Sequence, residues 1–137
     1  MILDSSAIIA ILRSEPDSAL YSEAIGSASL CSISAASYVE VAVVIDGKRN
    51  PVSSRDLDQL MKAAGIRIEP VTETQAKLAR EAYRDFGKGS GHKAQLNFGD
   101  CFAYALAKDK GEPLLFKGDD FRHTDVRVAS EEPGRVQ

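Results

Sequence analysis

Short apolar segments that alternate with longer, helix-like segments constrain the fold of this chain more than any other feature. Capping residues such as serine, threonine and asparagine precede most of the helix-like segments, and glycine or proline ends several of them. The pattern predicts strands at residues 1–3, 29–33, 66–71, 114–116 and 126–128. It predicts helices at residues 5–12, 17–28, 35–48, 53–64, 72–86 and 97–110.

Strands that alternate with helices are typical of a parallel sheet covered by helices on both faces. We therefore expect an α/β fold, specifically a three-layer α/β/α sandwich with a short central parallel sheet. The chain has 137 residues, of which 44% are hydrophobic, and this suits one domain over residues 1–130. Residues 131–137 contain proline and glycine and little apolar surface, so we expect a flexible C-terminal tail there.

Composition excludes several classes of protein. The net charge of −3 argues against a nucleic-acid binder with a broadly basic surface. No apolar run approaches the roughly 18 residues of a membrane span, and the first residues do not resemble a secretory signal, so we expect a cytoplasmic protein without membrane contact. The two cysteines, Cys31 and Cys101, form no CxxC motif, so the sequence supports neither a zinc site nor a redox site.

Acidic residues follow two of the predicted strands. Asp4 comes directly after the first strand, and Asp119 and Asp120 follow the strand at 114–116. Because an open α/β sheet binds ligands outside the carboxyl ends of its strands, these acids are candidates for a functional site. Alternatively, Asp4 caps the helix that follows it, and either Asp119 or Asp120 forms a turn with Gly118.

Two further acids lie in predicted helices. Asp100 is the third residue of a helix capped by Asn97, where it complements the helix dipole and has the alternative role of a capping-box residue. Glu40 interrupts an apolar helix whose core-facing stripe we expect to be Ala36, Val39, Val43 and Val44. An unpaired buried carboxylate is costly, so Glu40 requires a metal ion or a cationic side chain as its partner.

Carboxylates gathered at a strand edge suit a hard cation. Mg²⁺ and Mn²⁺ prefer oxygen ligands and commonly keep several waters beside a few carboxylates. A site of this kind supports phosphodiester hydrolysis, because the metal stabilises charge on the phosphate and makes a bound water more nucleophilic.

Four segments of the chain resemble the motifs of the PIN-domain ribonucleases, in particular the VapC-type toxins of bacterial toxin–antitoxin pairs. They are residues 2–7, the helix around Glu40, residues 96–101 and residues 114–121. The resemblance implies a PIN-like fold and a metal-dependent endoribonuclease that acts on RNA. It also implies that a cognate VapB-type antitoxin holds the protein inactive, and that the protein is a homodimer.

The same resemblance implies roles for individual acids. Asp4, Glu40 and Asp100 match the first three acidic positions of the family, with Asp4 and Asp100 as the most direct metal ligands and Glu40 as a water-mediated ligand or proton acceptor. Gly118 stands where many relatives carry the fourth acid. We expect Asp119 to replace it, with Asp120 as the alternative.

The loop from Phe86 to Lys93 is glycine-rich and basic. We expect Lys88, His92 and Lys93 to contact the RNA backbone, since the glycines allow close approach to a phosphate; the alternative is a solvated connector. Ser6 is a candidate for a hydrogen bond to substrate or to a carboxylate, and its alternative is a helix-start hydroxyl.

Three other classes of protein share parts of this pattern. A haloacid-dehalogenase-like phosphatase needs a second aspartate where this chain has Ser6. A receiver domain needs an acidic pair near Asp4, which is missing, although Lys117 matches its lysine. The remaining alternative is a catalytically inactive PIN-like module that binds RNA or protein.

Overall fold

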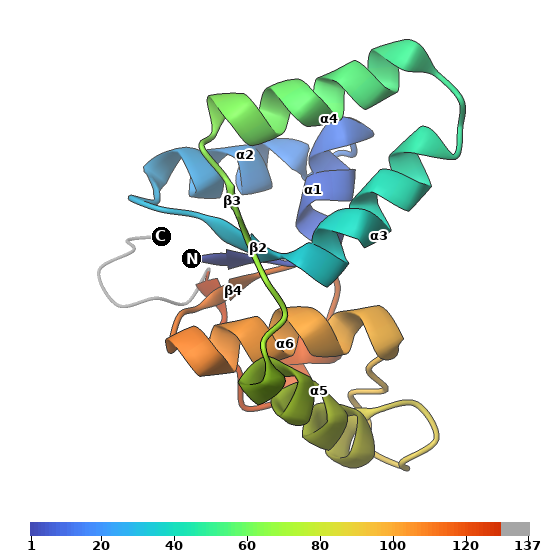
Figure 1. Cartoon of the computed structure of the whole chain (residues 1–137), viewed down its shortest axis with the longest axis vertical. Coiled ribbons are helices and arrows are strands. Elements are labelled where there is room, and N and C mark those ends of the chain that lie inside the picture. The colour runs from blue at the N-terminus through green and yellow to red at the C-terminus, as the bar shows by residue number, and fades with distance from the viewer. Residues whose placement is uncertain (130–137) are drawn as a thin grey trace.

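The sheet at the centre of the molecule has four parallel strands in the order β3-β2-β1-β4 (Figure 1). The computed structural model describes residues 1–129, so the tail predicted at residues 131–137 lies outside the described residues. The strands are β1 (Ile2–Leu3), β2 (Ser32–Ser34), β3 (Arg67–Glu69) and β4 (Leu114–Leu115).

Helices cover both faces of this sheet, which confirms the predicted α/β/α sandwich (Figure 1). One layer contains α1 (Ser5–Leu12), α2 (Ser18–Ser27), α3 (Ala35–Asp46) and α4 (Pro51–Ala63). The other contains α5 (Glu73–Phe86) and α6 (Phe98–Lys110). The chain steps from β1 to β2 to β3 and then returns across the sheet to β4. Because crossovers are right-handed, this reversal moves the connecting helices to the opposite face.

Strands β1 and β4 divide their residues between two apolar cores. Ile2 lies in the core beneath α5 and α6, and Leu3 lies in the core beneath the other four helices. Leu114 and Leu115 of β4 divide in the same way. This alternation is the two-residue period of a strand. The parallel pairing of β1 with β4 places the carboxyl ends of these two strands side by side.

The order of the strands creates one topological switch point at β1. The chain leaves β1 toward β2 on one side, and β4 pairs with β1 on its other side. The carboxyl ends of β1 and β4 therefore form the switch point where open α/β sheets bind ligands. Asp4 and the segment from Lys117 to Asp120 follow these two strand ends.

Two expectations about the fold were wrong. The strand predicted at 126–128 is reduced to a single bridge between Leu114 and Val128, with one backbone hydrogen bond from the Leu114 N–H to the Arg127 carbonyl at 2.8 Å. On α3 the buried residues are Ser37, Val41 and Ile45, whereas Val39 and Val43 are 56% and 66% exposed. Apolar residues occur on nearly every side of α3, so hydrophobicity alone does not define its buried face.

Candidate active site

Asp4 is buried at the end of β1, with 2% of its surface exposed. Its Oδ2 atom accepts a hydrogen bond from the Ser6 backbone N–H at 3.0 Å and caps α1, so the capping role is confirmed for this oxygen. Its Oδ1 atom is equally buried but has no hydrogen-bond partner among residues 1–129. Since a buried oxygen without a partner is costly, Asp4 keeps an unsatisfied acceptor at the carboxyl end of β1.

The surroundings of Asp4 oppose its negative charge. Burial raises the pKa of Asp4 from 3.8 to about 7, and the charges of Asp100 and Glu40 act in the same direction. Hydrogen bonds from Ser6 lower the pKa but do not cancel these effects. The mutual repulsion shows that the fold brings Asp4, Glu40 and Asp100 together from three separate elements.

Asp100 lies in the first turn of α6 and forms a complete capping box with Asn97. Asp100 Oδ2 accepts the Asn97 backbone N–H at 3.0 Å, and Asn97 Oδ1 accepts the Asp100 N–H at 3.0 Å. Burial raises the pKa of Asp100 to about 6, and the charges of Glu40 and Asp120 add to this rise. The capping box fixes the direction of the side chain, so the structural role and a role in the site coexist.

Glu40 reaches the site from α3 and is held by two residues that sequence reasoning did not assign to it. Ser5 Oγ donates a hydrogen bond to Glu40 Oε1 at 2.6 Å. Gly99 lies directly against the carboxylate, because a Cβ placed on Gly99 would be 2.8 Å from the carboxyl carbon of Glu40. The only sequence signal for Gly99 was a glycine inside a helix, next to a candidate acid.

The two candidates for the fourth acid differ in their surroundings. Asp120 lies close enough for its charge to raise the pKa of Asp100. The Asp119 side chain is 87% exposed, and its Oδ1 atom lies 3.8 Å from Nε of Arg122. Asp120 is therefore close to Asp100, whereas Asp119 faces solvent and a cation.

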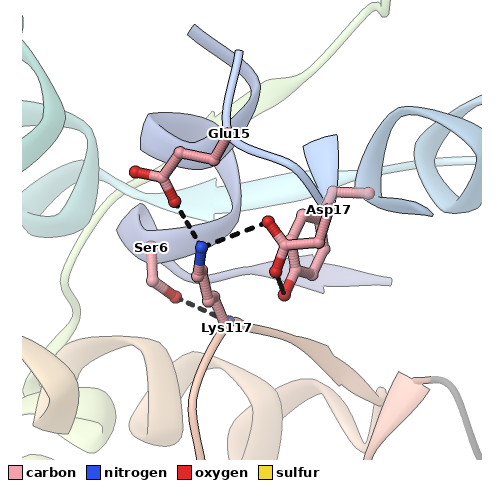
Figure 2. Close-up of polar contacts among 5 residues, drawn as sticks. Ser6, Glu15, Asp17 and Lys117 are labelled. Atoms are coloured by element: carbon pink, nitrogen blue, oxygen red, sulfur yellow. Dashed lines mark hydrogen bonds and ion pairs between the residues drawn. The ribbon is translucent and has the colours of Figure 1, made fainter. Parts of the chain in front are cut away.

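Ser6 is occupied by a backbone contact. Its hydroxyl oxygen accepts the backbone N–H of Lys117 at 2.9 Å, which joins α1 to the segment that follows β4 (Figure 2). This contact favours a structural role over the predicted contact with substrate.

The basic loop between α5 and α6 is closed at its base by hydrogen bonds between Lys88 and Leu96 and between Leu96 and Phe86. His92 Nδ1 accepts the Ala94 backbone N–H at 3.0 Å, and the His92 ring lies edge-on to Phe86. Lys88 is exposed and lies close enough to lower the pKa of Asp100. Lys93 is exposed as well. The structure thus places Lys88 beside the acids and gives His92 a part in shaping the loop.

The fit of a divalent cation rests on the chemistry of these acids. Within residues 1–129, no three acid, histidine or cysteine side chains form a ready metal-ligand group. The donor set nevertheless suits a hard cation, because the unpaired Oδ1 atom of Asp4 is surrounded by the like charges of Glu40 and Asp100. Mg²⁺ needs only one or two carboxylates when waters complete its shell.

The raised pKa values predict how stability depends on pH. Asp4 and Asp100 bind protons more tightly in the folded state, so without metal the free energy of unfolding should fall as pH rises from about 4 to about 7. For Asp4 the difference between 3.8 and about 7 corresponds to at most about 4 kcal/mol. Urea denaturation at several pH values in a chelator tests this. If the free energy of unfolding changed with pH in the same way in wild type and in Asp4→Asn, the prediction for Asp4 would be contradicted.

Comparisons with known proteins agree with this geometry. The sequence profile of the PIN domain family matches residues 1–127. Ribonuclease VapC28 of Mycobacterium tuberculosis is 60% identical over 129 residues, which cover 94% of this chain and 97% of the relative. Ribonuclease VapC42 of the same species is 47% identical over 129 residues, covering 94% and 98% of the two chains.

Two solved structures share the fold. The toxin VapC20 of Mycobacterium tuberculosis, described as cleaving the sarcin–ricin loop, has a TM-score of 0.70 at 16% identity and covers 91% of this chain and 95% of its own. FitAcB from Neisseria gonorrhoeae has a TM-score of 0.69 at 23% identity and covers 93% and 94%. The profile match, the close relatives and the acids at the switch point lead to one conclusion: the chain belongs to the PIN-domain family, among its VapC-type members.

Proposed function

We propose that this chain is an endoribonuclease, the toxin of a toxin–antitoxin pair, and that its acidic site uses Mg²⁺ or Mn²⁺ to hydrolyse RNA phosphodiester bonds. The observation that carries the proposal is the buried, unpaired Oδ1 atom of Asp4 beside Glu40 and Asp100. The ribonuclease names of relatives at 47–60% identity support the choice of RNA as substrate.

The acids have different parts in this reaction. Asp4 and Asp100 hold the metal, from a strand end and from a helix start. When bound, the metal stabilises charge on the phosphate and makes a water more nucleophilic. Glu40 orients the attacking water and accepts its proton, and Ser5 Oγ fixes the carboxylate for that task. We propose Asp120 as the fourth acid in place of Asp119, because Asp120 is coupled to Asp100.

The surroundings of the site supply the contacts to RNA. Lys88 is exposed beside Asp100, so it is placed to bind a phosphate next to the scissile bond. Lys93 extends the same basic loop. His92 supports the loop through its contact with Phe86 rather than by binding RNA.

The partners follow from the family. We propose a VapB-type antitoxin as the inhibitor, a homodimer as the working form and the cytoplasm as the location. In the described part of the chain, no helix is both long enough and apolar enough to cross a bilayer.

Cleavage of RNA with and without Mg²⁺ or Mn²⁺ tests the function, with wild type, Asp4→Ala and Asp100→Ala compared. We expect cleavage by wild type only with metal, and none by either variant. Metal-independent cleavage, or full activity of a variant, would contradict the mechanism. Binding of RNA without cleavage in either metal would favour an inactive binding module. Expression without an antitoxin should also arrest growth, and Asp4→Ala should relieve the arrest.

The basic loop gives a separate prediction. Lys88→Ala should raise KM several-fold and reduce the slope of log affinity against log salt by about 1, because one phosphate contact is lost. Lys93→Ala should have a smaller effect, because Lys88 is the lysine whose charge acts on the pKa of Asp100. Exposed Lys62 of α4 provides the control variant Lys62→Ala. Unchanged KM and an unchanged salt slope in Lys88→Ala would contradict the assignment.

A further inference from the structure

Lys117 makes three contacts that none of the functional assignments above uses. Its backbone N–H donates to Ser6 Oγ at 2.9 Å. Its ammonium pairs with Glu15 at 2.5 Å and with Asp17 at 3.1 Å (Figure 2). Ser6 lies in the first turn of α1, and the two acids lie in the connection between α1 and α2. Lys117 therefore joins the end of β4 to both ends of α1.

The segment that Lys117 begins is the one that carries the fourth acid. Only Gly118 and Asp119 separate Lys117 from Asp120, and Gly118 has a φ of +99°, which turns the chain sharply. Beyond Asp120, the Phe121 ring is buried and packs on Phe116 with ring centroids 5.1 Å apart. The Lys117–Asp120 turn is thus fixed at its far end by the apolar core and at its near end by Lys117.

The same contacts connect this turn to Asp4. Lys117 donates to the side chain of Ser6, and the backbone N–H of Ser6 donates to Asp4 Oδ2 at 3.0 Å. One serine thereby sets the turn and the buried carboxylate relative to each other. Movement of Lys117 would change the distance between Asp120 and the other acids.

The two ion pairs of the Lys117 ammonium indicate that it positions the turn rather than binding a phosphate of the substrate. Glu15 and Asp17 both contact the Lys117 ammonium, so the local charge around it is negative and unfavourable for a phosphate. Asp17 is held in turn by a hydrogen bond from the Tyr21 hydroxyl at 3.1 Å. Exposed ion pairs add little to stability, so the main consequence of this cluster is geometric.

We propose that Lys117 is a positioning residue that sets Asp120 against the other acids, an inference that rests on the proposed ribonuclease function. The Lys117–Asp120 turn is held to α1 by the Lys117 backbone and ammonium together. Without the ammonium, the turn loses both ion pairs to the connection after α1 and depends on the Ser6 contact at its near end, so Asp120 samples positions away from Asp100.

Steady-state cleavage of an RNA oligonucleotide tests the proposal. Lys117→Met should lower kcat about tenfold or more with KM within twofold, and Lys117→Arg should restore most of the rate. In an Asp120→Asn background, Lys117→Met should add less than a twofold loss, because the residue through which it acts is already disabled. A full additional loss in the double variant, or a change confined to KM and the salt slope, would overturn the proposal.

Lys108 offers a matched control. Its side chain is 36% exposed, against 39% for Lys117, and it pairs with Asp125 at 3.0 Å on a different part of the surface. Lys108→Met should therefore lose as little stability as Lys117→Met and leave kcat unchanged. Equal losses of kcat in the two variants would show a general effect of removing an ion pair and would overturn the positioning role.

Hydrogen exchange gives a readout that does not depend on cleavage. Amides of residues 117–122 should exchange faster in Lys117→Met than in wild type or Lys108→Met, including the Arg122 N–H that donates to the Asp119 carbonyl. Unchanged protection would overturn the proposal even if cleavage falls. A wild type that cleaves no RNA in either metal, with faster exchange in Lys117→Met, would overturn the proposed function while supporting the contact between Lys117 and α1.

Discussion

An Asp4→Asn variant should lose RNA cleavage by about 10³-fold or more, and yet it should be more stable than wild type at pH 7.5 without metal. The loss of rate follows from removal of a charged metal ligand, since about 4 kcal/mol of transition-state stabilisation corresponds to about 10³ in rate. The gain in stability follows because the uncharged amide no longer meets the burial and like charges that oppose the carboxylate.

The helix cap survives this substitution. The side-chain oxygen of asparagine accepts the Ser6 backbone N–H as well as that of aspartate, so α1 keeps its N-terminus. Thermal unfolding with and without excess Mg²⁺ measures both effects. Metal should raise the melting temperature of wild type and leave that of Asp4→Asn unchanged. Asp58→Asn on the exposed side of α4 is the control. Wild-type cleavage by Asp4→Asn, or a lower stability at pH 7.5, would contradict the assignment.

A Gly99→Ala variant should lower kcat by about 10²-fold, although alanine is the better helix former. The added Cβ would lie against all three carboxyl atoms of Glu40, which Ser5 holds at 2.6 Å. Glu40 must therefore move, and a carboxylate displaced by about 1 Å loses a rate factor of this size. The effect should fall on kcat rather than KM, because no substrate contact is removed.

A glycine elsewhere in the chain supplies the control for this variant. In α2 a Cβ on Gly26 would meet no atom within 4 Å, so Gly26→Ala should gain about 0.5–1 kcal/mol of stability and cleave RNA normally. The clash with Glu40 should also lower the stability of Gly99→Ala. Because Glu40→Asp has a shorter side chain, the double variant should recover that stability. Normal cleavage by Gly99→Ala would contradict the prediction, because it would show that the reaction does not depend on the position of the Glu40 carboxylate.

Most of the architecture could be predicted from the sequence, because it depends on local patterns. Strand and helix segments alternate along the chain, and Ser34 and Asn97 cap the helices that follow them, as predicted. The position of Asp4 after the first strand follows from the same alternation, whereas the strand order that places the switch point at β1 comes from the structure. Helix boundaries were less certain, as at Asn50, which caps a helix that begins at Pro51 rather than at Ser53.

The choice among neighbouring residues required the tertiary structure. The sequence presents Asp119 and Asp120 side by side, and only the turn after Gly118 brings Asp120 near Asp100 while Asp119 lies near Arg122. Ser5 and Ser6 are also adjacent in the sequence. Only the packing of α1 against α3 and β4 lets Ser5 donate a hydrogen bond to Glu40 while Ser6 accepts one from Lys117.

The sequence by itself determined which segments form strands and helices and which acids follow strand ends, since backbone capping and hydrophobic period act between residues near in the chain. Only the tertiary structure decided which of those acids share a site, which face of α3 is buried and which residues hold Glu40 and the Lys117–Asp120 turn. These features depend on contacts between elements far apart in the sequence, where distance and burial set the energies, and no local pattern records them.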